Sequence, residues 1–136
     1  MTDASDTSAP EGMVIPATDA TYHDVVSTRS EPVLVAFMDE TDSTCRALLP
    51  ILTELARDRA GRLVVATIDV ATNPATVEAW GVTQVPAMLL FHRGVMQRVL
   101  RGVRPYARLV KEIDEIPFAR IRYAALLQRV DEPPSR

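Results

Sequence analysis

The chain has 136 residues, of which 47% are hydrophobic and 24% are charged. These proportions fit one globular domain with its own hydrophobic core, and the length leaves no room for two. The formal net charge of -3 does not indicate a dedicated nucleic-acid binder, and the single cysteine, Cys45, excludes an intramolecular disulfide and a cysteine-built zinc site.

The N-terminal segment, residues 1–12, is polar and acidic, without the basic start and apolar run of a secretory signal. We expect it to form a disordered tail on a cytoplasmic protein. The longest apolar stretches, such as residues 85–91, are far shorter than the roughly 20 residues that span a membrane. The sequence therefore predicts neither a membrane nor a nucleic acid as partner.

The first half of the chain predicts a strand–helix–strand unit. Residues 13–15 are compatible with a short outer strand and residues 21–28 with a short helix. Residues 33–37 and 63–70 are continuous apolar runs typical of buried strands, and residues 41–59 between them carry apolar side chains at helical spacing. We expect the two buried strands to be parallel, with a right-handed crossover.

The second half predicts a hairpin and a helix. Residues 87–91 form a third apolar run, residues 92–94 resemble a tight turn, and residues 95–101 return as an antiparallel strand. A helix is expected from Pro105 through Ile113. The predicted class is therefore α/β, with a central mixed β-sheet flanked by helices.

Residues 117–132 predict a C-terminal helical extension. Its apolar side chains recur at helical spacing over about three and a half turns, at Phe118, Ile121, Tyr123, Leu126, Leu127 and Val130. Such a helix is too apolar to stand free in water. It either packs on its own domain or forms a homo-oligomer interface, and both options stay open.

Positive charge gathers in one part of the chain. Residues 79–111 contain no acidic side chain and hold six basic ones, at Arg93, Arg98, Arg101, Arg104, Arg108 and Lys111. One interpretation is a docking patch for an acidic partner or for the protein's own acidic N-terminal half. The other is a solvated face.

A set of short motifs follows a characteristic order. They are Pro-Val-Leu-Val-Ala-Phe at 32–37, Cys-Arg-Ala-Leu-Leu-Pro-Ile-Leu at 45–52, Asp69, Asn-Pro at 73–74, Trp-Gly-Val-Thr-Gln-Val-Pro-Ala-Met-Leu-Leu-Phe at 80–91, Gly94 and Gly102. Together they resemble the thioredoxin family. The resemblance implies a thioredoxin-like fold for residues 13–116, a cis peptide bond before Pro86, and a helix bent at Pro50, and the C-terminal helix predicted at 117–132 is extra to this fold.

The chain departs from this family at the centre that carries the chemistry. Thioredoxins have Trp-Cys-Gly-Pro-Cys at the start of this helix, where the chain reads Thr41-Asp42-Ser43-Thr44-Cys45. Asp42 thus corresponds to the attacking cysteine, and only the second, resolving cysteine is kept, as Cys45. The buried carboxylate that assists proton transfer in the family corresponds to Ala36, which has none.

These replacements change the chemistry available at the helix start. Asp is a strong helix cap, so Asp42 is expected to take the amide hydrogen bonds that stabilise the family's thiolate. Its charge, about one turn from Cys45, is expected to raise the pKa of that thiol. Asp42 is then a plain helix cap, and Cys45 is either an inert buried side chain or a slow monothiol or redox-sensing group.

The sequence leaves two functional hypotheses. The first is a redox-inactive adaptor or chaperone-like protein that binds a protein or peptide through the groove formed by Thr41, Ser43, Thr44, Gln84, Val85 and Pro86, because backbone pairing requires no thiol. The second is a monothiol oxidoreductase or redox sensor that acts through Cys45 in cell redox homeostasis. No cofactor is expected, and His23 and His92 lie too far apart in sequence to suggest a metal site.

Overall fold

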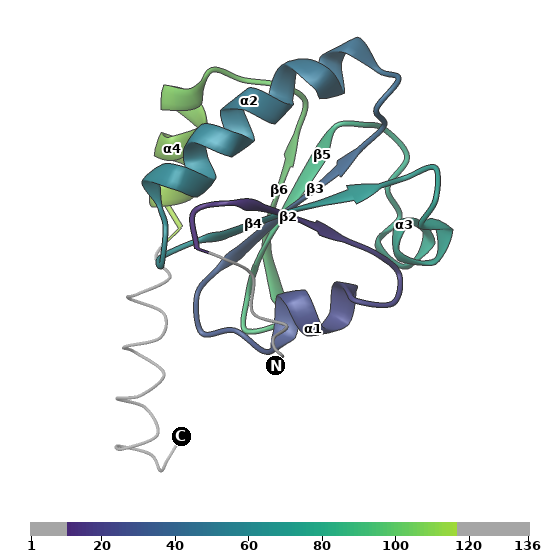
Figure 1. The fold of residues 1–136 in the computed structure, drawn as a ribbon, viewed down its shortest axis with the longest axis horizontal. Helices are drawn as coiled ribbons and strands as arrows, with labels where there is room; N and C mark the ends of the chain where they lie inside the picture. The colour runs from purple at the N-terminus through teal and green to yellow at the C-terminus, as the bar shows by residue number, and fades with distance from the viewer. Residues whose placement is uncertain (1–10, 117–136) are drawn as a thin grey trace, which may run out of the picture.

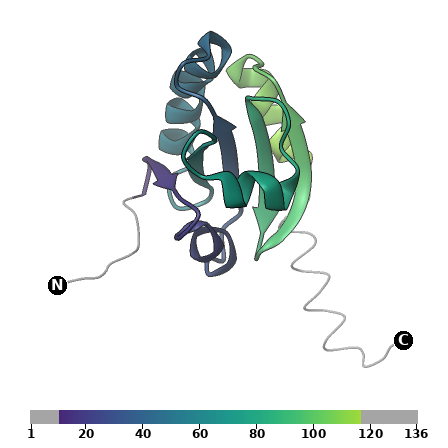
Figure 2. The ribbon, with the colours of Figure 1, turned by 90° about the vertical axis from the view of Figure 1, so that its right-hand side faces the viewer.

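The computed structural model describes residues 11–116, which form one mixed five-stranded sheet with two helices on each face (Figures 1 and 2). The strands are β2 (Val14–Ala17), β3 (Val33–Met38), β4 (Val64–Asp69), β5 (Ala87–His92) and β6 (Val95–Arg101), in the spatial order β2-β4-β3-β5-β6. The helices are α1 (Tyr22–Ser27), α2 (Ser43–Asp58), α3 (Pro74–Trp80) and α4 (Tyr106–Asp114).

The pairing of the strands confirms the predicted mixed sheet. β3 and β4 are parallel and joined through α2, and β2 extends the parallel part on the other side of β4. β5 pairs antiparallel with both β3 and β6. Arg93 and Gly94, which join β5 to β6, have φ values of 54° and 82°, as a tight hairpin turn of the primed type requires.

The central strand β3 is buried on both faces, as its continuous apolar sequence predicts. Leu34 and Ala36 point into a core that the sheet shares with α2 and α4, where Leu48, Leu52 and Leu109 are fully buried. The side chains between them contribute to a second core beneath α1 and α3. The central strand β3 is therefore held in place by packing on both faces of the sheet.

Aromatic side chains anchor the second core. Trp80, at the end of α3, meets Phe91 of β5 edge to face with ring centroids 5.1 Å apart, and Tyr22 of α1 at 6.3 Å. Such edge-to-face pairs add to the free energy gained by burial. They fix the start of the segment that leads from α3 to β5, which carries Gln84 and Pro86.

Helix α4 is tied to α2 at the far end of the first core. The guanidinium of Arg59 makes two hydrogen bonds of 2.9 Å to the carboxylate of Asp114, and the Tyr106 hydroxyl donates to Asp58. The hydrogen bond to Asp58 raises the pKa of Tyr106 to about 12. No helix within residues 11–116 is long and apolar enough to cross a membrane.

The observed elements differ from the predicted ones in two places. Helix α3 is not predicted by the sequence, and the outer strand begins at Val14 and runs to Ala17 instead of covering residues 13–15. The C-terminal helix at 117–132, and with it the predicted homo-oligomer interface, lies outside the described residues. Of the predicted tail at 1–12, only Glu11 and Gly12 are described, and they form a turn.

Candidate functional site

Three segments meet along the edge that the strand ends form, where β3 and β6 end and β5 begins. Ala87, the first residue of β5, lies opposite Phe37 of β3 on one side and opposite Arg101 of β6 on the other. The chain that leaves β3, the chain that enters β5 and the chain that leaves β6 are therefore neighbours. This edge brings together the sequence-predicted residues of the helix start and those of the proline segment.

Asp42 is the N-cap of α2. Its backbone is extended, with φ -90° and ψ 124°, and its Oδ1 accepts hydrogen bonds from the amides of Thr44 at 2.8 Å and Cys45 at 3.1 Å. These amides have no partner within the helix, so the carboxylate stabilises the helix by accepting their hydrogen bonds and by placing a negative charge at the positive end of the helix dipole. The position that the family resemblance assigns to the attacking cysteine is thus held by an aspartate that caps the helix.

Cys45 lies in the first turn of α2 and has no solvent-exposed surface. Burial raises the pKa of its thiol, the negative charges of Asp42 and Asp39 raise it further, and a hydrogen bond from the Asp39 amide to Sγ, 3.4 Å long, opposes them. The direction agrees with the expectation from the sequence, but burial contributes more than the charge of Asp42. A buried neutral thiol is a poor nucleophile.

The loop before α2 is held by its own side chains. Asp39 Oδ1 accepts from the amide of Thr41 at 2.9 Å and from its hydroxyl at 2.8 Å, which lowers the pKa of the Asp39 carboxyl. Arg46 donates to the carbonyl of Glu40 at 3.0 Å. Thr41, Ser43 and Thr44 are thereby placed in a fixed loop and first turn beside the sheet edge.

The segment before β5 presents free main-chain groups. The Val85–Pro86 peptide bond is cis, and the Pro86 carbonyl accepts a 3.0 Å hydrogen bond from the amide of Gly102. In contrast, the amides and carbonyls of Thr83, Gln84 and Val85 have no hydrogen-bond partner among residues 11–116. Since buried or ordered backbone groups are normally paired, this short edge is suited to receive another extended chain.

The position of the family's proton-transfer carboxylate is filled by an apolar side chain. Ala36 has no exposed surface and lies in β3 between Thr67 of β4 and Met88 of β5. Within residues 11–116, no group of three or more His, Cys, Asp or Glu side chains is arranged to hold a metal ion. A hollow of about 590 Å³ lies away from this edge, beside β2 and α1.

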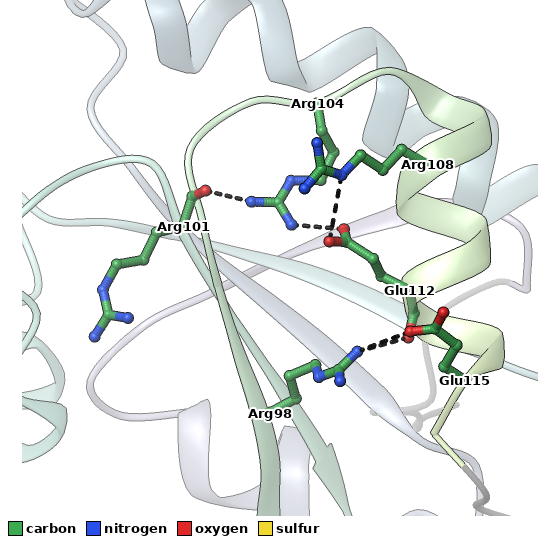
Figure 3. Close-up of polar contacts among 6 residues, drawn as sticks. All are labelled: Arg98, Arg101, Arg104, Arg108, Glu112 and Glu115. Carbon is green, nitrogen blue, oxygen red and sulfur yellow. Dashed lines mark hydrogen bonds and ion pairs between the residues drawn. The ribbon is translucent and has the colours of Figure 1, made fainter.

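The basic stretch divides into paired and unpaired side chains (Figure 3). Arg104 Nη1 lies 2.6 Å from Glu112 Oε1, and Arg108 Nε lies 3.5 Å from Glu112 Oε2. Arg98 pairs with Glu115 at 3.6 Å. The protein's own acids thus neutralise part of the stretch, but they belong to α4 and its C-cap, not to the N-terminal half.

Sequence reasoning misses the role of two residues at this edge. Arg101 is exposed and lies beside the proline segment, and Gly102, with φ of 83°, turns the chain so that its amide reaches the Pro86 carbonyl. The glycine and the basic charge are visible in the sequence, but their position depends on the register of the β5–β6 hairpin. The number of residues between the hairpin turn and Gly102 is the sequence signal that could have predicted this position.

The sheet order, the capped helix α2 and the cis-proline segment define a thioredoxin-like α/β protein. The family model for thioredoxin matches residues 13–115, most of the chain. The chain therefore belongs to the thioredoxin family.

Individual relatives agree with this assignment. Over 110 residues the chain is 33% identical to a thioredoxin of Mycobacterium tuberculosis, an alignment that covers 81% of this chain and 95% of that protein. It is 32% identical over 116 residues to the bifunctional thioredoxin reductase/thioredoxin of Mycobacterium leprae, covering 85% of this chain and 24% of that protein. The solved structure of a mutant thioredoxin from Halobacterium salinarum NRC-1 superposes with a TM-score of 0.72 at 27% identity, covering 80% of this chain and 95% of that chain.

Proposed function

We propose that this member of the thioredoxin family binds an extended polypeptide segment as an adaptor or chaperone-like protein and does not catalyse dithiol–disulfide exchange. The observation that carries the proposal is the main-chain edge at Thr83, Gln84 and Val85 beside Pro86, whose amides and carbonyls have no partner among the described residues 11–116. Such an edge binds an incoming strand through backbone hydrogen bonds, which need no sulfur. Thr41, Ser43 and Thr44 would form the opposite wall of the groove.

The chemistry of exchange supports the negative part of the proposal. Reduction of a disulfide transfers two electrons: one thiolate attacks to form a mixed disulfide, and a second thiol of the same centre displaces the reduced partner. This chain has one cysteine, so a mixed disulfide at Cys45 would persist until an external thiol attacked it. The missing carboxylate at Ala36 also removes the group that accepts the proton.

The alternative is a monothiol oxidoreductase or redox sensor that uses Cys45. Its support is the family itself, because the relatives are named thioredoxin. Against it stand the complete burial of Cys45 and the raised pKa of its thiol, which both lower the fraction of accessible thiolate. We therefore give the binding role preference.

Insulin reduction driven by dithiothreitol tests the loss of exchange activity. The expected result is a precipitation rate equal to that with dithiothreitol alone, for the chain and for Cys45→Ser alike. A matched dithiol thioredoxin serves as the positive control. Acceleration by the chain that disappears in Cys45→Ser would overturn the proposal and establish the monothiol alternative.

Chemical-shift mapping tests the binding role. We expect an extended peptide to shift the amide signals of Thr83, Gln84, Val85 and Gly102, while the signals of β2, the outermost strand on the other side of β3 and β4, stay in place. Shifts confined to β2 and α1 would place binding at another surface and contradict the proposed groove.

A further inference from the structure

Two rims of opposite charge flank the segment Val85–Pro86. Ala87 has Phe37 of β3 on one side and Arg101 of β6 on the other. Neighbouring strands lie about 4.8 Å apart, so the two rims are separated by about 10 Å at the sheet edge. A chain that lies across these strand ends, from β3 towards β6, would have one rim at each of its ends.

The rim on the β3 side is acidic. Directly after β3 come Asp39, Glu40 and, at the start of α2, Asp42. The carboxylates of Asp39 and Asp42 accept hydrogen bonds from the loop and the helix start, which fixes their positions, and Glu40 is exposed. This side of the groove therefore presents a fixed negative potential to anything bound at the edge.

The rim on the β6 side is basic because of one residue that the basic stretch leaves unpaired. Arg101 is exposed and has no ion-pair partner within the described part of the chain. Figure 3 shows its guanidinium extending away from the Arg104–Glu112 pair, on the other side of the strand. Its charge is thus available to a ligand.

The backbone of Arg101 is held in place on two sides. Arg104, which is mostly buried and paired with Glu112, donates a hydrogen bond to the Arg101 carbonyl. On the other side, the amide of Gly102 donates to the Pro86 carbonyl at 3.0 Å. The ion pair between Arg104 and Glu112 of α4 therefore holds the backbone of Arg101 next to the proline segment.

We propose that the groove recognises an extended peptide of a partner protein by charge polarity: a segment with an acidic side chain at the end that meets Arg101 and a basic side chain at the end that meets Asp39, Glu40 and Asp42. The centre of the segment is uncharged, in keeping with Val103, an apolar side chain two residues after Arg101 with 36% of its surface exposed. Charge complementarity of this kind selects orientation and partner more than it adds affinity. This inference rests on the proposed binding function.

The test compares two labelled peptides of identical composition by fluorescence anisotropy at low salt. Both have a centre of alternating valine and threonine; one carries glutamates at its N-terminal end and lysines at its C-terminal end, and the other has these ends exchanged. We expect dissociation constants that differ about fivefold, with the difference shrinking as salt is added. A third peptide, with glutamine at both ends, measures binding without charge.

Two variants assign the effect to one side chain. Arg101→Gln should reduce the difference between the two charged peptides to less than about twofold. Arg93→Gln removes an exposed arginine at the opposite end of the same hairpin and should leave the difference unchanged. Thermal unfolding of both variants checks that the fold is kept.

The outcomes separate this inference from the function on which it rests. Equal affinity of the charged peptides and the glutamine peptide, or a preference that survives Arg101→Gln, overturns polarity recognition and leaves the binding function standing. Failure of all three peptides to bind contradicts the binding function, and the polarity inference falls with it. A preference lost in Arg101→Gln and kept in Arg93→Gln supports both.

Discussion

The two sides of the candidate groove have diverged to different degrees from the dithiol centre that the thioredoxin family resemblance implies. On the α2 side, an aspartate stands for the attacking cysteine, and the proton-accepting carboxylate is replaced by Ala36. The β5 side keeps the features that the resemblance implies for it. The Val85–Pro86 bond is cis, Gly102 donates to the Pro86 carbonyl, and the main-chain groups just before Pro86 have no partner among residues 11–116.

Under the proposed function, exchange and binding depend on different parts of one site. Exchange needs particular side-chain atoms, and the proposal attributes its loss to two replacements, at Asp42 and Ala36. Binding of an extended chain relies on main-chain amides and carbonyls, whose positions are set by the sheet register and not by the residues on the α2 side. A chain can lose the first and keep the second.

Alkylation of Cys45 tests the α2 side with the largest expected effect. The thiol is fully buried and its pKa is raised, chiefly by burial, so iodoacetamide should modify the native chain at least about 100-fold more slowly than the chain in denaturing urea. The native rate should also keep rising with pH beyond the range where an ordinary thiol levels off. A native rate close to that of the unfolded chain would mean that Cys45 is accessible and reactive.

Restoring a second sulfur should partly reverse the difference between the two sides. In Asp42→Cys, the amides of Thr44 and Cys45 would stabilise a thiolate at the helix start, and Cys45 could then act as the resolving thiol. We expect insulin reduction to rise at least about tenfold above the parent chain, yet stay slow because Ala36 offers no base. The double variant with Cys45→Ser is the control, and a folded Asp42→Cys chain without any gain would show that the groove has diverged too.

The cap itself has a moderate effect on stability. Asp42→Ala should lower the free energy of unfolding by about 1 kcal/mol, because two helix amides lose their acceptor. Asp42→Ser keeps an oxygen at the N-cap and should cost less. Urea unfolding measures both, and equal stability of the alanine and serine variants would contradict the capping role.

The smallest effect is expected on the β6 side. Burial alone would raise the pKa of Glu112, but the hydrogen bond and charge of Arg104, with Arg108, outweigh it and hold the pKa below its ordinary value of 4.5. Because the pKa is lowered in the folded state, the stabilisation is present above 4.5 and is lost as the pH falls through the folded-state pKa.

Glu112→Gln should therefore lower the unfolding free energy by less than about 1 kcal/mol at neutral pH. The difference from the parent chain should vanish in acid. Denaturant titrations across the acidic range provide the measurement, and a difference that persists unchanged in strong acid would show that the carboxylate charge is not its source.

Most of the sheet could be predicted because its strands are buried on both faces. β3, β4 and β5 are formed by mostly continuous apolar runs, which distinguishes them from half-exposed strands, where apolar and polar residues alternate. The hairpin between β5 and β6 is visible from Gly94, which supplies the positive φ that the turn needs. In these segments the residue types alone are enough to predict the structure.

Helix α3 is not predicted, and the side chain that accepts from its first amides comes from elsewhere in the chain. Asp19 accepts hydrogen bonds from the amides of Ala75 at 3.1 Å and Thr76 at 2.8 Å, and from the Thr76 hydroxyl. These contacts join residues more than fifty positions apart, and the neighbouring Asn73 makes no side-chain cap. Pro74 in the first turn and Gly81 in the left-handed conformation at the C-cap are local signals for α3, but seven residues are too few to show a helical period of apolar side chains.

The candidate site could be predicted only in part for a similar reason. The helix start is readable from Asp42 and Cys45, which lie three positions apart. The charge pattern is not, because six basic side chains in one stretch look alike until the hairpin register places Arg98 toward α4 and Arg101 beside Pro86. Arginines that pair with Glu112 or Glu115 are then distinguished from Arg101, which has no ion-pair partner among the described residues.

The buried sulfur of Cys45 also bears on how the protein responds to its surroundings. Dithiol thioredoxins exist in an oxidised and a reduced form, and the ratio follows the redox potential of the compartment. A chain with one thiol, enclosed in the first turn of α2, has no internal disulfide form to populate. We expect its shape, its melting temperature and its affinity for a peptide to be the same in reducing and oxidising buffers.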